Sequence, residues 1–290
     1  MSGKEAAVGR IIQTWELVGR SFAILKSDTQ LMLLPVVSGV FCILVSVVIL
    51  DAGALVFPAQ IQTFVAVGGQ RAPITQGMWV CLFLFYLANY FVVVFFNVAL
   101  VSTASSRLTG GHASVNDGLQ TAWQRKGKIL QWALLAATVG VLLRMLEERM
   151  AWLGRFVAGL IGVAWTLASY FVVPVLALED VGPAEALQRS ADLFRDTWGE
   201  QVVGGFSFEL IFALLALPGI ALPLLLGRNL GRRGVVVGAI LAVIYWLCLA
   251  ITSAAVKGIF VAALYRYAKT KEIPLGFRLE DFSMAWQAKR

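Results

Sequence analysis

Charged residues are scarce in this chain, and their scarcity sets the first limit on what the protein can be. Asp, Glu, Lys and Arg make up 14% of its 290 residues, whereas an ordinary soluble domain carries about 25%. Hydrophobic residues make up 59%, and the mean hydropathy is +0.79. A water-soluble fold of this composition would expose large apolar patches, so the sequence predicts an integral membrane protein.

Histidine and cysteine are nearly missing too, which excludes most metal and redox chemistry. The single histidine, His112, has no neighbouring ligand, and Cys42, Cys81 and Cys248 fall inside apolar runs without the paired spacing of a metal site or a disulfide framework. One histidine also leaves no room for a Ser-His-Asp triad, and no phosphate-binding glycine loop or nucleophile elbow occurs. We therefore expect no catalytic residue, no metal and no cofactor.

The net charge of +7 does not indicate nucleic-acid binding. Lys and Arg flank the apolar runs, where they can meet anionic lipid headgroups, and they are not interleaved with aromatic residues that could stack on bases. The expected partners are membrane lipids and, as an open alternative, another membrane protein or a cytosolic protein. The oligomeric state stays open.

Six apolar stretches are long enough to cross about 30 Å of hydrocarbon, which takes roughly 20 helical residues. Their continuous apolar character favours helices over the alternating strands of a membrane barrel. The predicted fold is all-α, a polytopic membrane helix bundle within a single membrane domain, residues 1–290. The predicted spans are Leu31–Phe57, Trp79–Thr103, Ile129–Leu146, Phe156–Leu178, Val202–Leu226 and Val235–Leu264.

Orientation follows from the basic residues of the connections. With the N-terminus inside, the inner segments hold more than twice as many Lys and Arg residues as the outer ones, as expected for cytoplasmic loops. Residues 1–30 then form a cytosolic amphipathic N-terminus, 31–265 the spans, and 266–290 a basic cytosolic tail. The basic turn at 227–234 runs against this rule, so the orientation of the last hairpin stays open.

A short amphipathic segment precedes each pair of spans, which predicts three pseudo-repeats of amphipathic helix plus helical hairpin. These segments are residues 11–26, 115–128 and 184–198. In the third, Ala184, Leu187, Ala191 and Phe194 recur at helical spacing among charged residues, which is typical of an interfacial helix.

The layout resembles an uncharacterised group of bacterial six-span membrane proteins and the membrane domain attached to some glycerophosphodiester phosphodiesterases. The resemblance rests on the architecture and on short elements, Phe96-Asn97-Val98-Ala99-Leu100 and Ala186-Leu187-Gln188. It implies a location in the bacterial inner membrane and an association with envelope or lipid processes. No phosphodiesterase barrel accompanies these elements, so the resemblance implies no hydrolytic activity.

Two ionisable residues fall within predicted spans, where a charge is costly and marks a functional candidate. Glu209 in the fifth span and Lys257 in the sixth lie at a similar depth, about 12 Å at 1.5 Å per residue. Because an isolated buried charge is unfavourable, the two are expected to pair. The pair is interpreted either as a structural staple or as part of a transport or proton pathway; snorkelling without contact is the third possibility.

Three further polar residues lie within spans, Asp51, Asn89 and Asn97. Asp51, near the outer end of the first span, is expected to reach the headgroups or to pair with Arg144 or Arg149. Asn89 and Asn97 are expected to hydrogen-bond across helices rather than to form a substrate site.

Small residues and prolines predict how the helices pack. Small residues recur at every fourth position in two places, where they allow close helix approach: Gly154, Ala158 and Gly162, and Gly234, Gly238 and Ala242. Pro174, Pro218 and Pro223 are expected to kink or interrupt their helices. The run 217–223 is the strongest candidate for a broken helix at membrane depth.

Together these features favour a non-enzymatic inner-membrane protein, a scaffold or a lipid- and envelope-associated helper. The rival hypothesis is a small-solute or lipid transporter or channel that uses Glu209 and Lys257. The acidic segment 179–200 is interpreted either as a solvated face or as a docking surface for a basic partner. Its acidic residues are Glu179, Asp180, Glu185, Asp192, Asp196 and Glu200.

The predicted topology can be tested with single cysteines placed at Ser2 and at Gly69 in a chain whose own cysteines are replaced. An impermeant thiol reagent added to sealed cells should label Gly69→Cys but not Ser2→Cys, because the two positions lie on opposite sides of the first span. Labelling of both positions from the same side would show that the first hairpin is misplaced.

Overall fold

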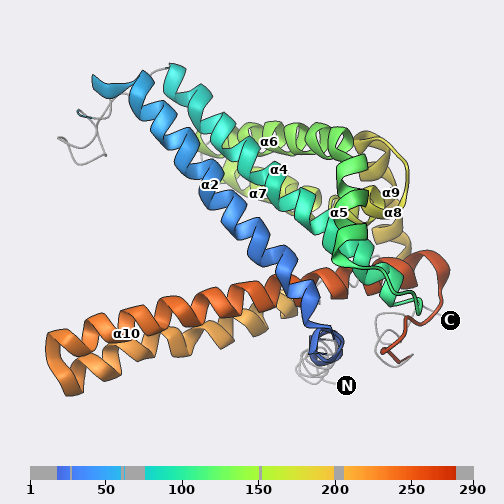
Figure 1. The fold of residues 1–290 in the computed structure, drawn as a ribbon. Coiled ribbons are helices and arrows are strands. Elements are labelled where there is room, and N and C mark those ends of the chain that lie inside the picture. Colours follow the sequence, from blue (N-terminus) through green and yellow to red (C-terminus); the bar gives the residue numbers. More distant parts are fainter. Residues whose placement is uncertain are drawn as a thin grey trace. The chain divides into compact units, whose positions relative to one another are not determined.

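Within the part of the chain that the structure describes, all regular secondary structure is helical. The computed structural model describes residues 18–26, 28–59, 62, 76–149, 152–198 and 206–278. The elements in chain order are η1 (Thr29–Met32), α2 (Leu33–Val56), α4 (Gln76–Arg107), α5 (Val115–Gln124), α6 (Lys126–Arg149), α7 (Trp152–Ala168), α8 (Val172–Leu178), α9 (Pro183–Trp198) and α10 (Phe206–Thr270) (Figure 1).

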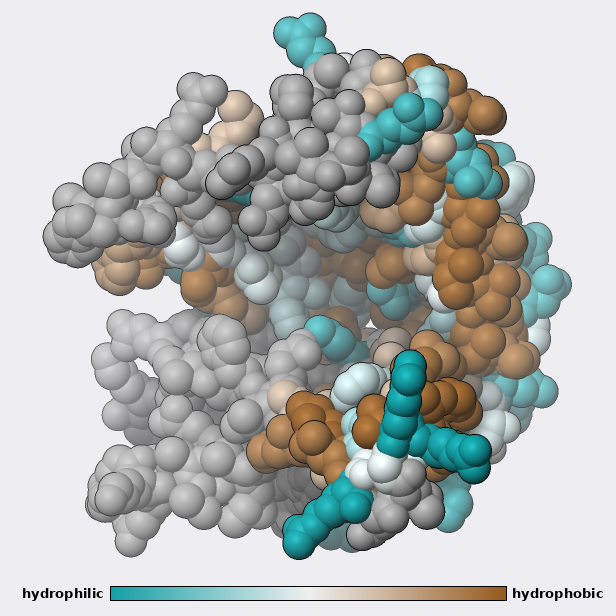
Figure 2. Space-filling model, turned by 90° about the vertical axis from the view of Figure 1, so that its left-hand side faces the viewer, coloured by the Kyte–Doolittle hydropathy of each residue, from teal (hydrophilic) through white to brown (hydrophobic). Residues whose placement is uncertain are grey.

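Six helical stretches are long and apolar enough to cross a bilayer, which confirms the predicted all-α, six-span fold. They are Thr29–Val56, Gln76–Arg107, Lys126–Leu146, Phe156–Leu178, Ile211–Arg228 and Gly231–Thr270. Hydrophobic side chains stand at the surface along these helices (Figure 2). Val48 and Leu224 are 66% and 70% exposed, an arrangement that is stable only where hydrocarbon replaces water.

The chain divides into two compact units that interleave along the sequence. One unit comprises Met1–Pro35, Leu100–Gly118 and Asp192–Arg290, and the other comprises Val36–Ala99 and Leu119–Ala191. The first therefore contains the hairpin of α10, and the second contains most of α2 and α4 together with α6, α7 and α8. The predicted threefold internal repeat stays a prediction.

In the second unit, α2 packs beside α4, and α6 packs beside α7 (Figure 1). The Ser46 hydroxyl of α2 donates a hydrogen bond to Asn89 Oδ1 of α4 at 3.3 Å, and Asn89 Nδ2 donates to the Phe85 carbonyl at 2.9 Å. Between α6 and α7, the rings of Trp132 and Trp165 stack, with their centroids 5.8 Å apart. Asn89 thus supplies a polar contact between helices whose other facing side chains are mainly apolar.

In the first unit, α10 turns back on itself at Gly231, and its two arms lie side by side (Figure 1). Gly231 has φ 60° and ψ −144° and is the one residue inside α10 with non-helical torsion angles. A side chain would be strained in this conformation, whereas glycine adopts it readily. The turn therefore depends on a glycine that the sequence places inside a basic loop.

The prediction of a broken helix at 217–223 is wrong. Helical torsion angles persist through Pro218 and Pro223. A proline inside a helix lacks an N–H donor and displaces the carbonyls of the preceding turn. Here the Tyr245 hydroxyl donates to the Leu215 carbonyl, and Trp246 Nε1 donates to the Ala216 carbonyl at 3.0 Å. Side chains of the facing arm thus bind two carbonyls of the turn that precedes Pro218.

The small residues of the sixth span form the face that meets the fifth span. Gly234, Gly238 and Ala242 are buried in a stretch whose other side chains are mostly exposed. A methyl group on Gly238 would lie 2.5 Å from Pro223 Cα, so the two backbones are in contact. In the other series, Ala158 is buried, Gly154 is half-buried, and open space surrounds the Cβ position of Gly162.

The fourth span is divided, as expected for a helix that contains Pro174. A turn at residues 169–171 separates α7 from α8. In a continuous helix, the Pro174 ring would clash with the backbone carbonyl of Tyr170, four residues earlier. The helix is therefore interrupted there and begins again at Val172. The interruption leaves polar backbone groups that other elements must satisfy.

A substitution pair tests the backbone contact in the α10 hairpin. Gly238→Ala should lower the free energy of unfolding by about 1–3 kcal/mol, because the added methyl group meets backbone atoms that cannot rotate away. Gly162→Ala should leave stability unchanged or raise it by up to about 1 kcal/mol, because alanine favours the helix and the site is open. Unfolding in mixed detergent micelles gives both values; equal effects would contradict the close contact.

Candidate membrane-interface site

Helix α5 begins with a reciprocal cap formed by Ser114 and Asp117. The Asp117 carboxylate accepts hydrogen bonds from the Ser114 backbone N–H at 2.7 Å and from its hydroxyl at 2.9 Å, and the Ser114 hydroxyl accepts from the Asp117 N–H at 3.3 Å. This arrangement satisfies donors that a helix N-terminus leaves free. The backbone hydrogen bond from Ser114 holds the pKa of Asp117 below its usual value.

Helix α5 ends at Gln124, so the amphipathic segment expected at 115–128 is shorter than predicted. A turn at Arg125 separates it from α6, which begins at Lys126. The Arg125 N–H bonds to the carbonyls of Thr121 and Ala122, both at 3.2 Å. Arg125 therefore occupies the corner between the amphipathic helix and the membrane-spanning helix, a position from which its side chain reaches another element.

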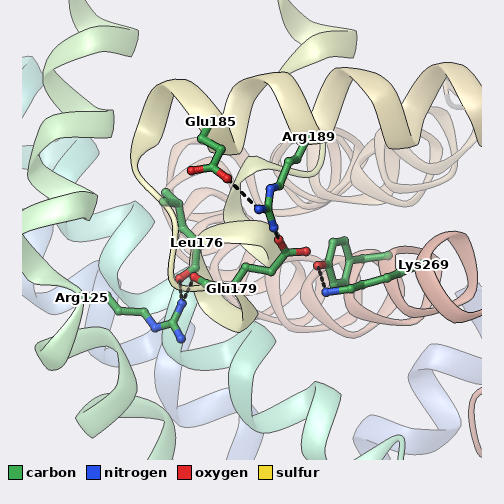
Figure 3. Close-up of polar contacts among 7 residues, drawn as sticks. Arg125, Leu176, Glu179, Glu185, Arg189 and Lys269 are labelled. Atoms are coloured by element: carbon green, nitrogen blue, oxygen red, sulfur yellow. Dashed lines mark hydrogen bonds and ion pairs between the residues drawn. The ribbon is translucent and has the colours of Figure 1, made fainter.

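The Arg125 side chain caps the C-terminal end of α8. Its Nη1 donates to the carbonyl of Leu176 at 2.6 Å and to the carbonyl of Glu179 (Figure 3). The last carbonyls of a helix lack partners within the helix, and they also form the negative end of its dipole. A guanidinium there satisfies both carbonyls and complements the dipole, so Arg125 fixes the end of the fourth span to the α5–α6 corner.

The side chain of Glu179 connects this corner to α9. It pairs with Arg189, which also pairs with Glu185 one turn earlier in α9 at 2.6 Å (Figure 3). The Glu179 side chain is 8% exposed, and its hydrogen bond to Arg189 raises the pKa of that guanidinium. The connection between α8 and α9 is therefore closed by two carboxylates that share one arginine.

A second ion pair lies beside the first, at the start of α6. Lys128 Nζ is 2.5 Å from Asp180 Oδ1, and the hydrogen bond from Lys128 holds the pKa of the Asp180 carboxyl below its usual value. Asp180 is 87% exposed, so solvent screens this pair. Three residues of the predicted acidic segment, Glu179, Asp180 and Glu185, thus have basic partners within the chain, and Glu200 lies outside the described residues.

Helix α9 docks at the interruption of the fourth span. The Phe171 backbone N–H donates to the Ser190 hydroxyl at 2.8 Å, and both residues are fully buried. The break before Pro174 frees this N–H, and α9 supplies the acceptor. Of the apolar face predicted for α9, Ala184 is exposed, whereas Ala186 and Ser190, which lie outside that face, are buried; sequence periodicity gave Ser190 no special weight.

At the same corner, a cation and an aromatic ring stand at the surface. Lys126 Nζ lies 4.0 Å from the centroid of the Trp123 ring, a distance at which the ring quadrupole attracts the ammonium. Trp123 is 62% exposed, and it lies three residues before Lys126, the first residue of the helix that spans the membrane. Trp is enriched at membrane–water interfaces, where its ring and N–H meet different solvents.

The first unit is closed by an ion pair at the end of α4. Arg107 pairs with Asp28, whose side chain is 13% exposed, and Arg107 Nε donates to the Ala113 carbonyl at 3.0 Å. The Leu275 N–H donates to the Leu108 carbonyl at 3.1 Å. These contacts bring the segment before α2, the end of α4 and the residues after α10 together.

The polar residues that the sequence singled out inside the spans do not form a common site in the described structure. Asn89 bonds to Ser46 as described above, and Asn97 is half-buried. Asp51 is exposed near the end of α2, Arg144 is exposed on α6, and the Arg149 side chain lies outside the described residues. Among the described residues, no group of His, Cys, Asp and Glu could hold a metal ion.

The expected Glu209–Lys257 ion pair stays a prediction. The backbone of Glu209 belongs to α10, but its side chain lies outside the described residues. Lys257 is exposed on the second arm of α10.

Arg125 can be tested against a neighbouring basic residue. Arg125→Met should lower the free energy of unfolding by about 3 kcal/mol, because it removes two charge-assisted hydrogen bonds and leaves the α8 carbonyls without their donor. Lys128→Met should have a much smaller effect, because its ion pair is open to solvent. Hydrogen exchange should also rise across 176–191 in Arg125→Met alone; similar behaviour of both variants would contradict the capping role.

Most of the chain matches the model of one protein family. The model of a family described as "Family of unknown function (DUF6159)" matches residues 76–274, a stretch that contains five of the six candidate spans and all of the Arg125 contacts. No curated protein and no solved structure matches the chain. The chain therefore belongs to this family of unknown function.

Proposed function

We propose that this protein is a non-enzymatic scaffold of the bacterial inner membrane that associates with anionic phospholipid. In this proposal, α5 and α9 lie at the cytoplasmic leaflet, in agreement with the orientation predicted from the basic loops. The spans anchor the protein, and the docked amphipathic helices present a fixed surface to the headgroups.

The observation that carries the proposal is the exposed Trp123–Lys126 pair. Arg125 and Lys128, which flank Lys126, are engaged with groups of the chain itself, whereas the Lys126 ammonium contacts an exposed ring. A lysine over an interfacial tryptophan can bind a lipid phosphate while the ring contacts the upper acyl region. The pair thus combines the two features by which interfacial proteins hold anionic lipid.

The contacts of α9 support a fixed role for this helix. An amphipathic helix that only senses lipid packing would bind through its apolar face, but α9 is also held by Ser190 and by the paired Arg189. Because Glu179, Asp180 and Glu185 have partners within the chain, a large basic protein is a weaker candidate for this surface than lipid. The helix is therefore proposed to be a built part of the scaffold.

Fluorine NMR of protein labelled with 5-fluorotryptophan tests the lipid association at one residue. The chain has nine tryptophans, and the Trp123→Phe variant assigns the Trp123 resonance. In nanodiscs, replacing part of the phosphatidylcholine with phosphatidylglycerol should shift this resonance, because the added lipid changes the charge next to the ring. Lys126→Gln should abolish the shift, and Lys271→Gln, a control at another exposed lysine outside the spans, should preserve it.

Two results would contradict the proposal. A Trp123 resonance that does not shift when phosphatidylglycerol is added would show that anionic lipid does not associate at this site. Solute flux in proteoliposomes that disappears in Glu209→Gln would replace the scaffold with the transporter hypothesis.

A further inference from the structure

A groove in the first unit lies between the two arms of α10 and the helical segment 18–26. Its volume is about 400 Å³. The lining residues are Val18, Gly19 and Phe22 from the segment, Phe212 and Leu215 from the first arm, and Tyr245, Cys248, Leu249 and Thr252 from the second arm. All three walls belong to the same compact unit.

Among the described residues, the walls of the groove offer almost no polar group to an occupant. The two hydroxyls that line it are engaged with the chain, since Tyr245 donates to the Leu215 carbonyl and Thr252 donates to the Cys248 carbonyl at 2.8 Å. The Cys248 thiol is a weak donor. A polar or charged ligand would lose its hydration here without compensation, so the groove selects an apolar occupant.

The position of the groove along the span places it in one leaflet. Tyr245 and Thr252 lie 14 and 21 residues after Gly231, which corresponds to about 21 Å and 32 Å along a helix. A hydrocarbon layer is about 30 Å thick. On the first arm, Phe212 and Leu215 lie at the end of the span Ile211–Arg228 that is remote from the Gly231 turn. The groove therefore lies toward that end of the hairpin, where the segment 18–26 forms its third wall.

The size of the groove matches part of a lipid rather than a whole one. An apolar cavity of about 150 Å³ accommodates benzene, and ligand sites range from about 300 to 1,000 Å³. The groove, at about 400 Å³, falls at the lower end of this range. A flexible hydrocarbon chain fits such a space, and the bilayer around α10 supplies one at high concentration.

We infer that this groove binds one acyl chain of a phospholipid from the leaflet next to segment 18–26. The inference deepens the proposed function, on which it rests, by naming the part of the lipid that the first unit holds. The bound chain fills the space between the α10 arms and the segment, and so joins the N-terminal segment to the last hairpin. The headgroup of the same lipid lies at the interface.

A phosphatidylcholine that carries a diazirine in the middle of one acyl chain provides the test. The full-length protein is reconstituted with a small fraction of this lipid in phosphatidylcholine nanodiscs, illuminated, and digested for mass spectrometry. Cross-links should concentrate on the lining residues of α10. Leu249→Trp, which fills the groove, should lower this labelling several-fold.

Leu247→Trp is the matched control. Leu247 lies in the same arm two residues away, is 59% exposed and does not line the groove, so this variant should label like the wild type. Gly19→Leu tests the opposite wall. A Cβ at Gly19 meets no atom within 4 Å, so the variant should fold, fill the groove and lower labelling even if Leu249→Trp does not fold.

Three results would overturn the inference. Equal labelling around the whole circumference of α10 would mean that ordinary boundary lipid surrounds it. Cross-links that spare the lining residues would show that no acyl chain enters the groove, and unchanged labelling in Gly19→Leu would remove the groove as the binding site. The cross-linking nanodiscs contain only zwitterionic lipid, so a negative cross-linking result would not change the expected response of Trp123 to phosphatidylglycerol. Conversely, a Trp123 resonance that does not respond to phosphatidylglycerol would not change the expected cross-linking of the groove.

Discussion

The constraint on which this structure depends is that every backbone polar group at membrane depth needs a partner, because hydrocarbon supplies none. Prolines make the constraint acute, since each removes one donor and disturbs the preceding turn. Near Pro218, the Tyr245 hydroxyl and the Trp246 indole donate to backbone carbonyls of the facing arm. Near Pro174, the Ser190 hydroxyl accepts from a freed N–H. Polar side chains of other elements therefore contact the backbone beside these prolines.

The same principle explains why α5, α8 and α9 meet at one place. A short helix such as α8, Val172–Leu178, has more unpaired terminal backbone groups than paired ones. It remains stable because Arg125 binds its last carbonyls and Ser190 binds the N–H at its start. Helix α9 and the α5–α6 corner are thus attached to the fourth span at the place where that span is interrupted. This attachment holds in place the surface that is proposed to bind lipid.

The sequence predicted the six spans well because hydrophobic length is a direct physical signal. It also identified the glycines of the sixth span, since small residues at every fourth position allow backbones to meet. It failed at Pro218 and Pro223, because whether a proline interrupts a helix depends on donors elsewhere in the chain. For the same reason it did not single out Arg125 or Ser190, whose partners lie 51 and 19 residues away and follow no local pattern.

The interleaving of the two units has a consequence for biosynthesis. The unit Val36–Ala99 and Leu119–Ala191 has been fully translated before Asp192 is reached, whereas the other unit combines an early, a middle and a late segment of the chain. The ion pair of Asp28 with Arg107 can close early, but Leu108 waits for Leu275. During insertion, the early segments of that unit must therefore persist at the membrane surface with unburied apolar side chains until α10 emerges from the ribosome.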